Sequence, residues 1–213
     1  MVVIVSWIFY RYAAPKSWKE WRGAGLVQAF IIALYAEMYG FPLTIYLLTG
    51  VLGVNLPLSG YTGYLWATLL GYGAGGAMVE MFIGWAFVLL GLALLIEGWR
   101  EVYWANRQNR LATRGLYGLV RHPQYTGIFL ALLGQLIHWP TIITLALFPV
   151  IAFVYVRLAR SEERDLVRKY GEQYLEYQRR VPMFFPTMQR WPELIEALSG
   201  GESSTPRDRD KAA

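Results

Sequence analysis

The positions of lysine and arginine constrain this chain more than any other feature. Neither residue occurs from Gly23 through Trp99 or from His122 through Val156, although the 213-residue chain contains 20 of them. Both stretches are rich in apolar and aromatic side chains. Because about 20 apolar residues in a helix cross a bilayer core of roughly 30 Å, these stretches predict a membrane-embedded helical protein.

The same charge pattern predicts how the chain crosses the membrane. Basic residues favour the cytoplasmic side, and the basic blocks at 11–22, 100–121 and 157 onward are separated by the two apolar stretches. Each apolar stretch must therefore cross the membrane from the cytoplasmic side and cross back again. This predicts an all-α, polytopic membrane helix bundle with four crossings and cytoplasmic termini, and a fifth crossing if residues 1–12 insert. The expected crossings are Ala24–Val54, bent at Gly40 and Pro42, then Met78–Trp99, Gln124–His138 and Thr141–Leu158.

The segments outside these crossings differ in composition. Residues 55–77 carry no Lys or Arg and are expected on the outer side, with a short helix at Leu65–Leu70. Ser161–Tyr177 alternates charged residues with Tyr and Leu at helical spacing, which predicts a cytoplasmic C-terminal amphipathic helix with Gly171 as a candidate break. Val181–Pro186 then ends that helix as an apolar strip.

Composition argues against two classes of ligand. The chain has no Cys and two His, and its carboxylates are not clustered around them, so we expect no metal site. The net charge of +5 does not indicate nucleic acid, because the basic residues follow the predicted membrane topology. We therefore expect neither metal nor nucleic acid among the partners.

Gly115–Gly127, with the sequence GLYGLVRHPQYTG, is the densest polar motif of the chain. Arg121, the titratable His122, a proline that fixes φ and the amphipathic Tyr125 directly precede an apolar helical run. By themselves these residues favour an anchor at a helix N-terminus, a role that Arg and Tyr often have in membrane proteins. A ligand site at the membrane surface is the alternative.

Three motifs in a fixed order resemble a known family. GLYGLVRHPQYTG, then SEERDL, then YGEQYLEYQRRVPMFFP are similar to the C-terminal half of the isoprenylcysteine carboxyl methyltransferase family and its phospholipid methyltransferase relatives. The resemblance implies a methyltransferase-like cofactor-binding region at residues 100–190. This region is preceded by an N-terminal interfacial segment at 1–23 and by transmembrane helices at 24–99. It is followed by a polar tail at 191–213, which is expected to be disordered.

The resemblance implies S-adenosylmethionine as the cofactor. We add Arg121 to the expected cofactor-binding residues, because the carboxylate of the cofactor needs a hydrogen-bond donor. In the family an arginine binds the substrate carboxylate, but Leu158 aligns with that arginine in this chain. The neighbouring Arg157 and Arg160 are therefore the candidates for binding the acceptor. Glu163 is a further candidate catalytic group. The expected cofactor-binding residues are Asn109, Arg110, Leu111, Ala112, Tyr117, Arg121, His122, Pro123, Gln124, Tyr125 and Glu162.

The residue types at these positions suit such a methyl donor. A sulfonium needs anionic and aromatic surfaces, and the amino acid head and the adenine need donors and stacking partners. A carboxylate acceptor needs no base, whereas an amine or thiol must lose a proton, for which His122 and Glu163 are candidates. Consecutive helical residues point about 100° apart, so only one of the glutamate pair can face the cofactor, and the resemblance to the family implies that it is Glu162 rather than Glu163.

Acidic residues within and beside the predicted crossings are a separate question. Glu37 lies inside the first crossing, and two interpretations stay open. It is either a functional site or a structural group that is neutral or hydrogen-bonded to a tyrosine or to Gln135. Glu80 and Glu97 flank the second crossing and are expected at the two interfaces.

The expected function is methyl transfer from S-adenosylmethionine to a lipophilic acceptor that enters from the bilayer. Candidate acceptors are an isoprenylcysteine-like carboxylate, a phospholipid amine and a small thiol. The expected location is an integral, multi-pass membrane protein with its cofactor site on the cytoplasmic side. Two alternatives stay open, namely an NADPH-dependent enzyme resembling sterol reductases, which share an RHPxY-like element, and a non-catalytic membrane scaffold.

Overall fold

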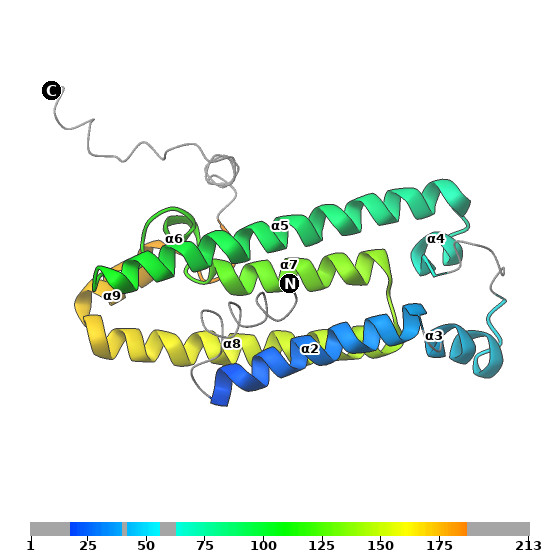
Figure 1. The fold of residues 1–213 in the computed structure, drawn as a ribbon, viewed down its shortest axis with the longest axis horizontal. Helices are drawn as coiled ribbons and strands as arrows, with labels where there is room; N and C mark the ends of the chain where they lie inside the picture. Colours follow the sequence, from blue (N-terminus) through cyan, green and yellow to red (C-terminus); the bar gives the residue numbers. More distant parts are fainter. Residues whose placement is uncertain (1–17, 40–41, 56–62, 187–213) are drawn as a thin grey trace, which may run out of the picture. The chain divides into compact units, whose positions relative to one another are not determined.

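A computed structural model describes residues 18–39, 42–55 and 63–186 of the chain. Helices are the only regular elements in these ranges, which confirms the all-α fold class (Figure 1). The expectations for residues 1–12, for most of the 1–23 segment and for the 191–213 tail lie outside the described residues, as does part of the 55–77 segment.

The chain forms two compact units. The first consists of Met1–Glu80 and Trp139–Ser161, and the second consists of Met81–His138 and Glu162–Ala213. Two long helices begin in the first unit and continue into the second, namely α5 (Gly73–Arg107) and α8 (Ile142–Tyr170). Each unit therefore combines segments that are distant in the sequence.

Among the described residues, two helices are long and apolar enough to cross a membrane, which supports an integral membrane protein. These are α5 and α8. A third candidate is the pair Gly23–Tyr39 and Leu43–Val51, whose axes differ by 67°. The shorter α7 (Pro123–His138) begins and ends within one residue of the predicted third crossing. The count of four crossings stays a prediction.

The bent pair belongs to the first unit and has the break that the sequence predicts. Helix α2 (Trp18–Tyr39) ends just before the expected bend at Gly40 and Pro42, and α3 (Leu43–Tyr46) begins just after it. A short π-helical segment, η1 (Leu47–Val51), follows. Proline at the position before α3 explains the restart, since it cannot donate a hydrogen bond within a continuing helix.

Two buried glutamates of the first unit accept hydrogen bonds at the beginnings of short helices. Glu37 accepts from the backbone N–H of Thr44 at 2.9 Å and from its hydroxyl at 3.0 Å. Glu80 accepts from the backbone N–H of Ala67 at 2.9 Å, near the start of α4 (Leu65–Leu69), the short helix that the sequence predicts. The first N–H groups of a helix lack partners within it, so both carboxylates have a structural role as helix caps.

These contacts bear on the interpretation of Glu37. Glu37 is hydrogen-bonded, as its structural interpretation predicts, but its partner is Thr44 and not a tyrosine or Gln135. Glu80 is buried within the protein, at 6% exposed, and its expected place at a membrane interface stays a prediction. The hydroxyl of Thr44 also accepts from the backbone N–H of Ile142 at 2.9 Å, and this contact ties α3 to the first turn of α8.

In the second unit, glycines bring α5 and α7 into close contact. A Cβ atom added to Gly91 would lie 2.4 Å from the carbonyl oxygen of Gly127, and one added to Gly134 would lie 2.6 Å from that of Gly84. Small residues at such interfaces allow membrane helices to approach backbone to backbone. Larger side chains at these positions would force α7 away from α5, and with it the polar motif at the N-terminus of α7.

The last crossing, expected at Thr141–Leu158, and the amphipathic helix, expected from Ser161, are not separate helices. Helix α8 continues without interruption to Tyr170, because the charged residues after Leu158 are good helix formers and none of them disrupts the helix. The break comes at Gly171, which adopts φ +57°, a left-handed conformation that glycine tolerates. Helix α9 (Glu172–Arg180) then completes the predicted amphipathic region.

Candidate functional site

The second unit contains a cavity of about 370 Å³ at the ends of several helices. Its walls come from the end of α5, the connection to α6 (Leu116–Leu119), the start of α7, the last three turns of α8, and α9. The lining residues are Val102, Ala105, Asn106, Arg110, Leu111, Ala112, Tyr117, Arg121, His122, Gln124, Tyr125, Glu162, Asp165, Leu166, Lys169, Tyr170, Tyr174 and Tyr177.

Most of the residues predicted to bind the cofactor line this cavity. They are Arg110, Leu111, Ala112, Tyr117, Arg121, His122, Gln124, Tyr125 and Glu162. The predicted Asn109 and Pro123 do not line it, but both shape the backbone beside it. Asn109 adopts φ +48°, and Pro123 is the first residue of α7, where its fixed φ suits a helix start.

The three predicted catalytic residues lie outside the cavity lining. Arg157 and Arg160 are exposed residues of the first unit, and the Arg157 guanidinium lies over the Phe153 ring at 5.6 Å. Glu163 is in the second unit, but its side chain is buried behind the lining residues. The neighbouring Glu162 is the member of the glutamate pair that reaches the cavity.

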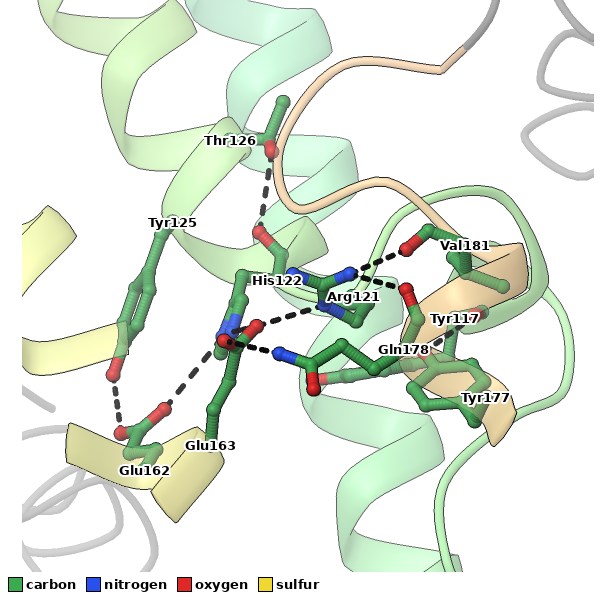
Figure 2. Close-up of polar contacts among 10 residues, drawn as sticks. All are labelled: Tyr117, Arg121, His122, Tyr125, Thr126, Glu162, Glu163, Tyr177, Gln178 and Val181. Atoms are coloured by element: carbon green, nitrogen blue, oxygen red, sulfur yellow. Dashed lines mark hydrogen bonds and ion pairs between the residues drawn. The ribbon is translucent and has the colours of Figure 1, made fainter. Parts of the chain in front are cut away.

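Glu162 lies on the cavity wall beside an aromatic partner. The hydroxyl of Tyr125 donates a hydrogen bond to Oε1 of Glu162, and Nδ1 of His122 lies 3.7 Å from Oε2 (Figure 2). The Glu162 side chain remains 38% exposed. The hydrogen bond from Tyr125 fixes the orientation of the Glu162 carboxylate, which can contact a cationic group of a ligand in the cavity.

Glu163 is held by three side chains from two segments, the residues just before α7 and helix α9. Its Oε1 accepts from Nε of Arg121 at 2.7 Å and lies 3.2 Å from Nε2 of His122, and its Oε2 accepts from the amide of Gln178 at 3.1 Å. Burial raises the pKa of the Glu163 carboxyl, but the hydrogen bonds from His122 and Arg121 and the charge of Arg121 lower it further, so the pKa falls below its ordinary value. Glu163 is therefore an anion in the folded protein.

Arg121 joins the start of α7 to the end of α9. Its Nη1 donates to the carbonyl oxygens of Gln178 at 2.9 Å and Val181 at 2.7 Å, close to the C-terminus of α9, where carbonyl groups lack helical partners (Figure 2). Its backbone N–H donates to the carbonyl of Pro182 at 2.9 Å. These side-chain contacts engage the guanidinium of Arg121 with protein groups, although its charge had suggested a contact with the cofactor carboxylate.

The apolar strip after α9 covers one face of His122. The backbone N–H of His122 donates to the carbonyl of Met183 at 3.1 Å, and the hydroxyl of Thr126 donates to that of Phe184 at 2.8 Å. The imidazole stacks on the Tyr125 ring at 5.5 Å and contacts the Phe184 ring at 5.9 Å. His122 is thus packed between two aromatic rings in a single orientation.

Tyrosines of α6 and α9 form another wall of the cavity. The hydroxyl of Tyr177 donates to the carbonyl of Tyr117 at 2.6 Å, and the Tyr174 and Tyr177 rings pack at 5.8 Å. Burial raises the pKa of the Tyr117, Tyr174 and Tyr177 phenols, so all three stay neutral. Tyr174 and Tyr177 were not among the residues predicted to bind the cofactor, although their spacing of three residues places them on one helical face.

Comparison with known proteins supports the resemblance found in the sequence. Residues 73–173 match the family model described as phospholipid methyltransferase. The chain is 35% identical over 117 residues to a methanethiol S-methyltransferase of Crocosphaera subtropica, which covers 49% of this chain and 44% of the relative. It is 32% identical over 82 residues to a protein-S-isoprenylcysteine O-methyltransferase of Schizosaccharomyces pombe, which covers 38% of this chain and 35% of the relative.

Another relative has a different kind of name. A cobalt-zinc-cadmium resistance protein of Cupriavidus metallidurans is 36% identical over 104 residues, which cover 47% of this chain and 48% of the relative. The chain thus spans about half, or less, of the length of these curated relatives. No solved structure matches the chain.

Proposed function

On the premise that residues 73–173 form a phospholipid methyltransferase family segment, we propose that this protein is a membrane methyltransferase that uses S-adenosylmethionine. The observation that carries the proposal is the cavity of the second unit, where Glu162, Tyr125 and His122 meet at one wall. All the lining residues from Val102 to Tyr170 fall within the matched segment. The acceptor is lipophilic and reaches the site from the bilayer.

The residues around the cavity fit such a cofactor. S-Adenosylmethionine supplies a methyl group on a positively charged sulfur, which becomes a neutral thioether after transfer. Glu162 and the tyrosine rings favour a cationic group, and the amides of Asn106 and Gln124 offer donors and acceptors. The cavity volume of about 370 Å³ lies in the range of sites for small molecules.

The basic residues of the cavity suit a carboxylate of the ligand to different degrees. Arg110 donates to Glu101 at 2.7 Å and to the side chain of Gln108 at 2.7 Å, so it is already neutralised by a protein carboxylate. The ammonium of Lys169 lies over the Tyr170 ring at 4.9 Å and is exposed. Lys169 is therefore the better candidate for the carboxylate of a cofactor amino acid group.

The acceptor belongs to one of the three classes named above. Relatives are named for methanethiol and for isoprenylcysteine, so both a thiol and a carboxylate have precedent among similar proteins. Arg157 and Arg160 remain candidates for a carboxylate acceptor. A panel of a prenylated cysteine, a phosphatidylethanolamine and an alkyl thiol, each supplied with cofactor labelled in its methyl group, identifies the class that accepts the label.

Cofactor titration tests the proposal directly. S-Adenosylmethionine and NADPH are titrated by calorimetry into the full chain in detergent, together with the Tyr125→Phe variant and with Glu176→Gln, an exposed glutamate of α9, as the matched control. We expect saturable binding of S-adenosylmethionine that Tyr125→Phe weakens and Glu176→Gln leaves unchanged. Binding of NADPH alone favours the reductase alternative, and binding of neither ligand favours the scaffold.

We also propose that the cofactor site faces the cytoplasm, on the basis of the Lys/Arg distribution. The chain has no native Cys, so single cysteines can be introduced at Tyr72 and at Thr113, which are both exposed. A membrane-impermeant maleimide added to intact cells should label residue 72 and spare residue 113. The same reactivity at both positions would contradict this orientation.

A further inference from the structure

We infer that His122 is the base that takes the proton of the methyl acceptor, through Nδ1, and that the acceptor is therefore a thiol. Glu163 acts as the positioning residue that keeps the other ring nitrogen, Nε2, protonated. This inference rests on the proposed function and specifies the chemistry of the same site.

The surroundings of His122 select one tautomer of its ring. Nε2 lies 3.2 Å from Oε1 of Glu163, and an ionised carboxylate can only accept, so Nε2 carries the proton. Glu163 cannot turn away, because Arg121 and Gln178 hold its two oxygens at 2.7 and 3.1 Å. A buried carboxylate that orients an imidazole in this way is the arrangement that prepares a histidine for proton transfer.

Nδ1 is the ring nitrogen that points away from Glu163. Arg121 binds the same oxygen of Glu163, Oε1, that Nε2 faces, at 2.7 Å. Nδ1 faces Glu162 at 3.7 Å, which is too long for a hydrogen bond but close enough to stabilise a positive charge on the ring. The charged and titratable groups that contact His122 or its carboxylate partners are Glu162 and Glu163 from α8, Arg121, and Tyr125 from α7.

The proposed step conserves atoms and charge. The S–H bond of the acceptor breaks as its proton moves to Nδ1, and the sulfur lone pair forms a bond to the methyl carbon. The bond between that carbon and the sulfonium sulfur of the donor breaks, and its electron pair stays on the donor sulfur. The products are a methyl thioether, a neutral donor thioether and an imidazolium beside Glu162, which later loses its proton to water.

The surroundings of the ring favour a thiol among the three acceptor classes. A carboxylate acceptor is already ionised, so it has no proton for the His122–Glu163 pair to remove. Glu162 and the tyrosine rings of the cavity wall stabilise an ammonium as a cation, and so they oppose the loss of the proton that an amine acceptor must give up before it can attack. A thiol enters this environment as a neutral, weakly polar group.

Two thiols of similar size but different acidity separate this role from others. Phenylmethanethiol is protonated at neutral pH and needs a base, whereas 4-nitrobenzenethiol is already a thiolate. Methyl transfer to each is measured at saturating S-adenosylmethionine for the full chain and for His122→Gln, Glu163→Gln and the control Glu176→Gln. Because general base catalysis contributes about 10²–10⁴-fold, His122→Gln should lower kcat for phenylmethanethiol by about 100-fold or more and that for 4-nitrobenzenethiol by less than about threefold.

The outcomes distinguish this inference from the proposed function. Glu163→Gln should lower the phenylmethanethiol rate by about tenfold or more with little change for the thiolate, since a glutamine amide can stabilise the other tautomer. Equal losses with both thiols in both variants would make these residues structural or cofactor-binding groups and overturn the inference. Transfer only to a prenylated carboxylate or a lipid amine would also overturn it while the proposed function stands. Failure of the full chain to bind S-adenosylmethionine would refute both.

Discussion

The two units each bury glutamates, but they do so with different partners. In the first unit, Glu37 and Glu80 accept hydrogen bonds from backbone N–H groups at the beginnings of α3 and α4. In the second unit, Glu163 is bound by the side chains of Arg121, His122 and Gln178, and the neighbouring Glu162 lies on a cavity wall. Burial alone does not distinguish the two regions, because Glu37 and Glu163 are 8% and 6% exposed.

The partners of a buried carboxylate indicate its role better than its depth does. A helix N-terminus needs an acceptor and nothing else, so Glu37 and Glu80 complete backbone structure. A carboxylate beside a histidine and an arginine at a cavity can instead fix a tautomer or meet a ligand. Variants in the two regions should therefore change different properties of the protein.

The largest effect on stability should come from Arg121→Ala. The substitution leaves the carboxylate of Glu163 buried without its cation and removes the donors to Gln178 and Val181, so we expect a loss of about 3–5 kcal/mol in the free energy of unfolding. Thermal unfolding in detergent measures it. As a control, Arg179→Ala removes an exposed arginine whose ion pair with Glu172 at 3.5 Å should contribute about 0–1 kcal/mol. Similar losses of unfolding free energy in both variants would show that the buried contacts of Arg121 stabilise the protein no more than an exposed ion pair does.

Glu162→Gln should weaken cofactor binding with little effect on folding. The change keeps the shape of the side chain and removes the charge, so a charge-assisted contact worth about 1.5–3 kcal/mol is lost, or about tenfold or more in affinity. Tyr125 can still donate to the amide oxygen, so the melting temperature should stay near that of the unmodified protein. Calorimetric titration with S-adenosylmethionine measures the affinity. An unchanged dissociation constant would remove Glu162 from the binding site.

Glu37→Ala should have the opposite pattern. The backbone N–H and hydroxyl of Thr44 lose their acceptor, and an unsatisfied buried donor costs about 1–3 kcal/mol of stability. Cofactor affinity of the folded fraction should not change, and the same should hold for Glu80→Ala. Parallel measurements of melting temperature and affinity test this. A selective loss of affinity with normal stability would restore the functional interpretation of Glu37.

The smallest effect concerns pH. The pKa of Glu163 is lower in the folded protein than its ordinary value of 4.5, so its stabilising contribution is complete above that value and is lost as the pH falls through the folded-state pKa. The difference in melting temperature between the unmodified protein and Glu163→Gln should therefore be constant near neutral pH and shrink at acid pH. A difference that grows on acidification would contradict the ionised state assigned to Glu163.

Much of the fold could be predicted from the sequence because local rules determine it. The apolar stretches between basic blocks predicted α7 within one residue, the break near Pro42 and the short α4. Gly171 was identified as a candidate break because only glycine adopts a positive φ without strain. The end of α8 was missed, because the switch from apolar to charged residues looked like a boundary although it does not interrupt helical hydrogen bonds.

By itself the sequence determined which residues bear chemistry, through the ordered motifs that contain His122, Tyr125 and the glutamate pair. Only the tertiary structure decided which partner each of them has. Glu162 reaches the cavity and Glu163 binds Arg121, and Arg121 itself contacts carbonyl groups 57 and 60 residues later in the chain. Side-chain type and helical spacing are local properties, whereas the choice among several buried acceptors depends on how helices distant in the sequence pack, and no local pattern encodes that geometry.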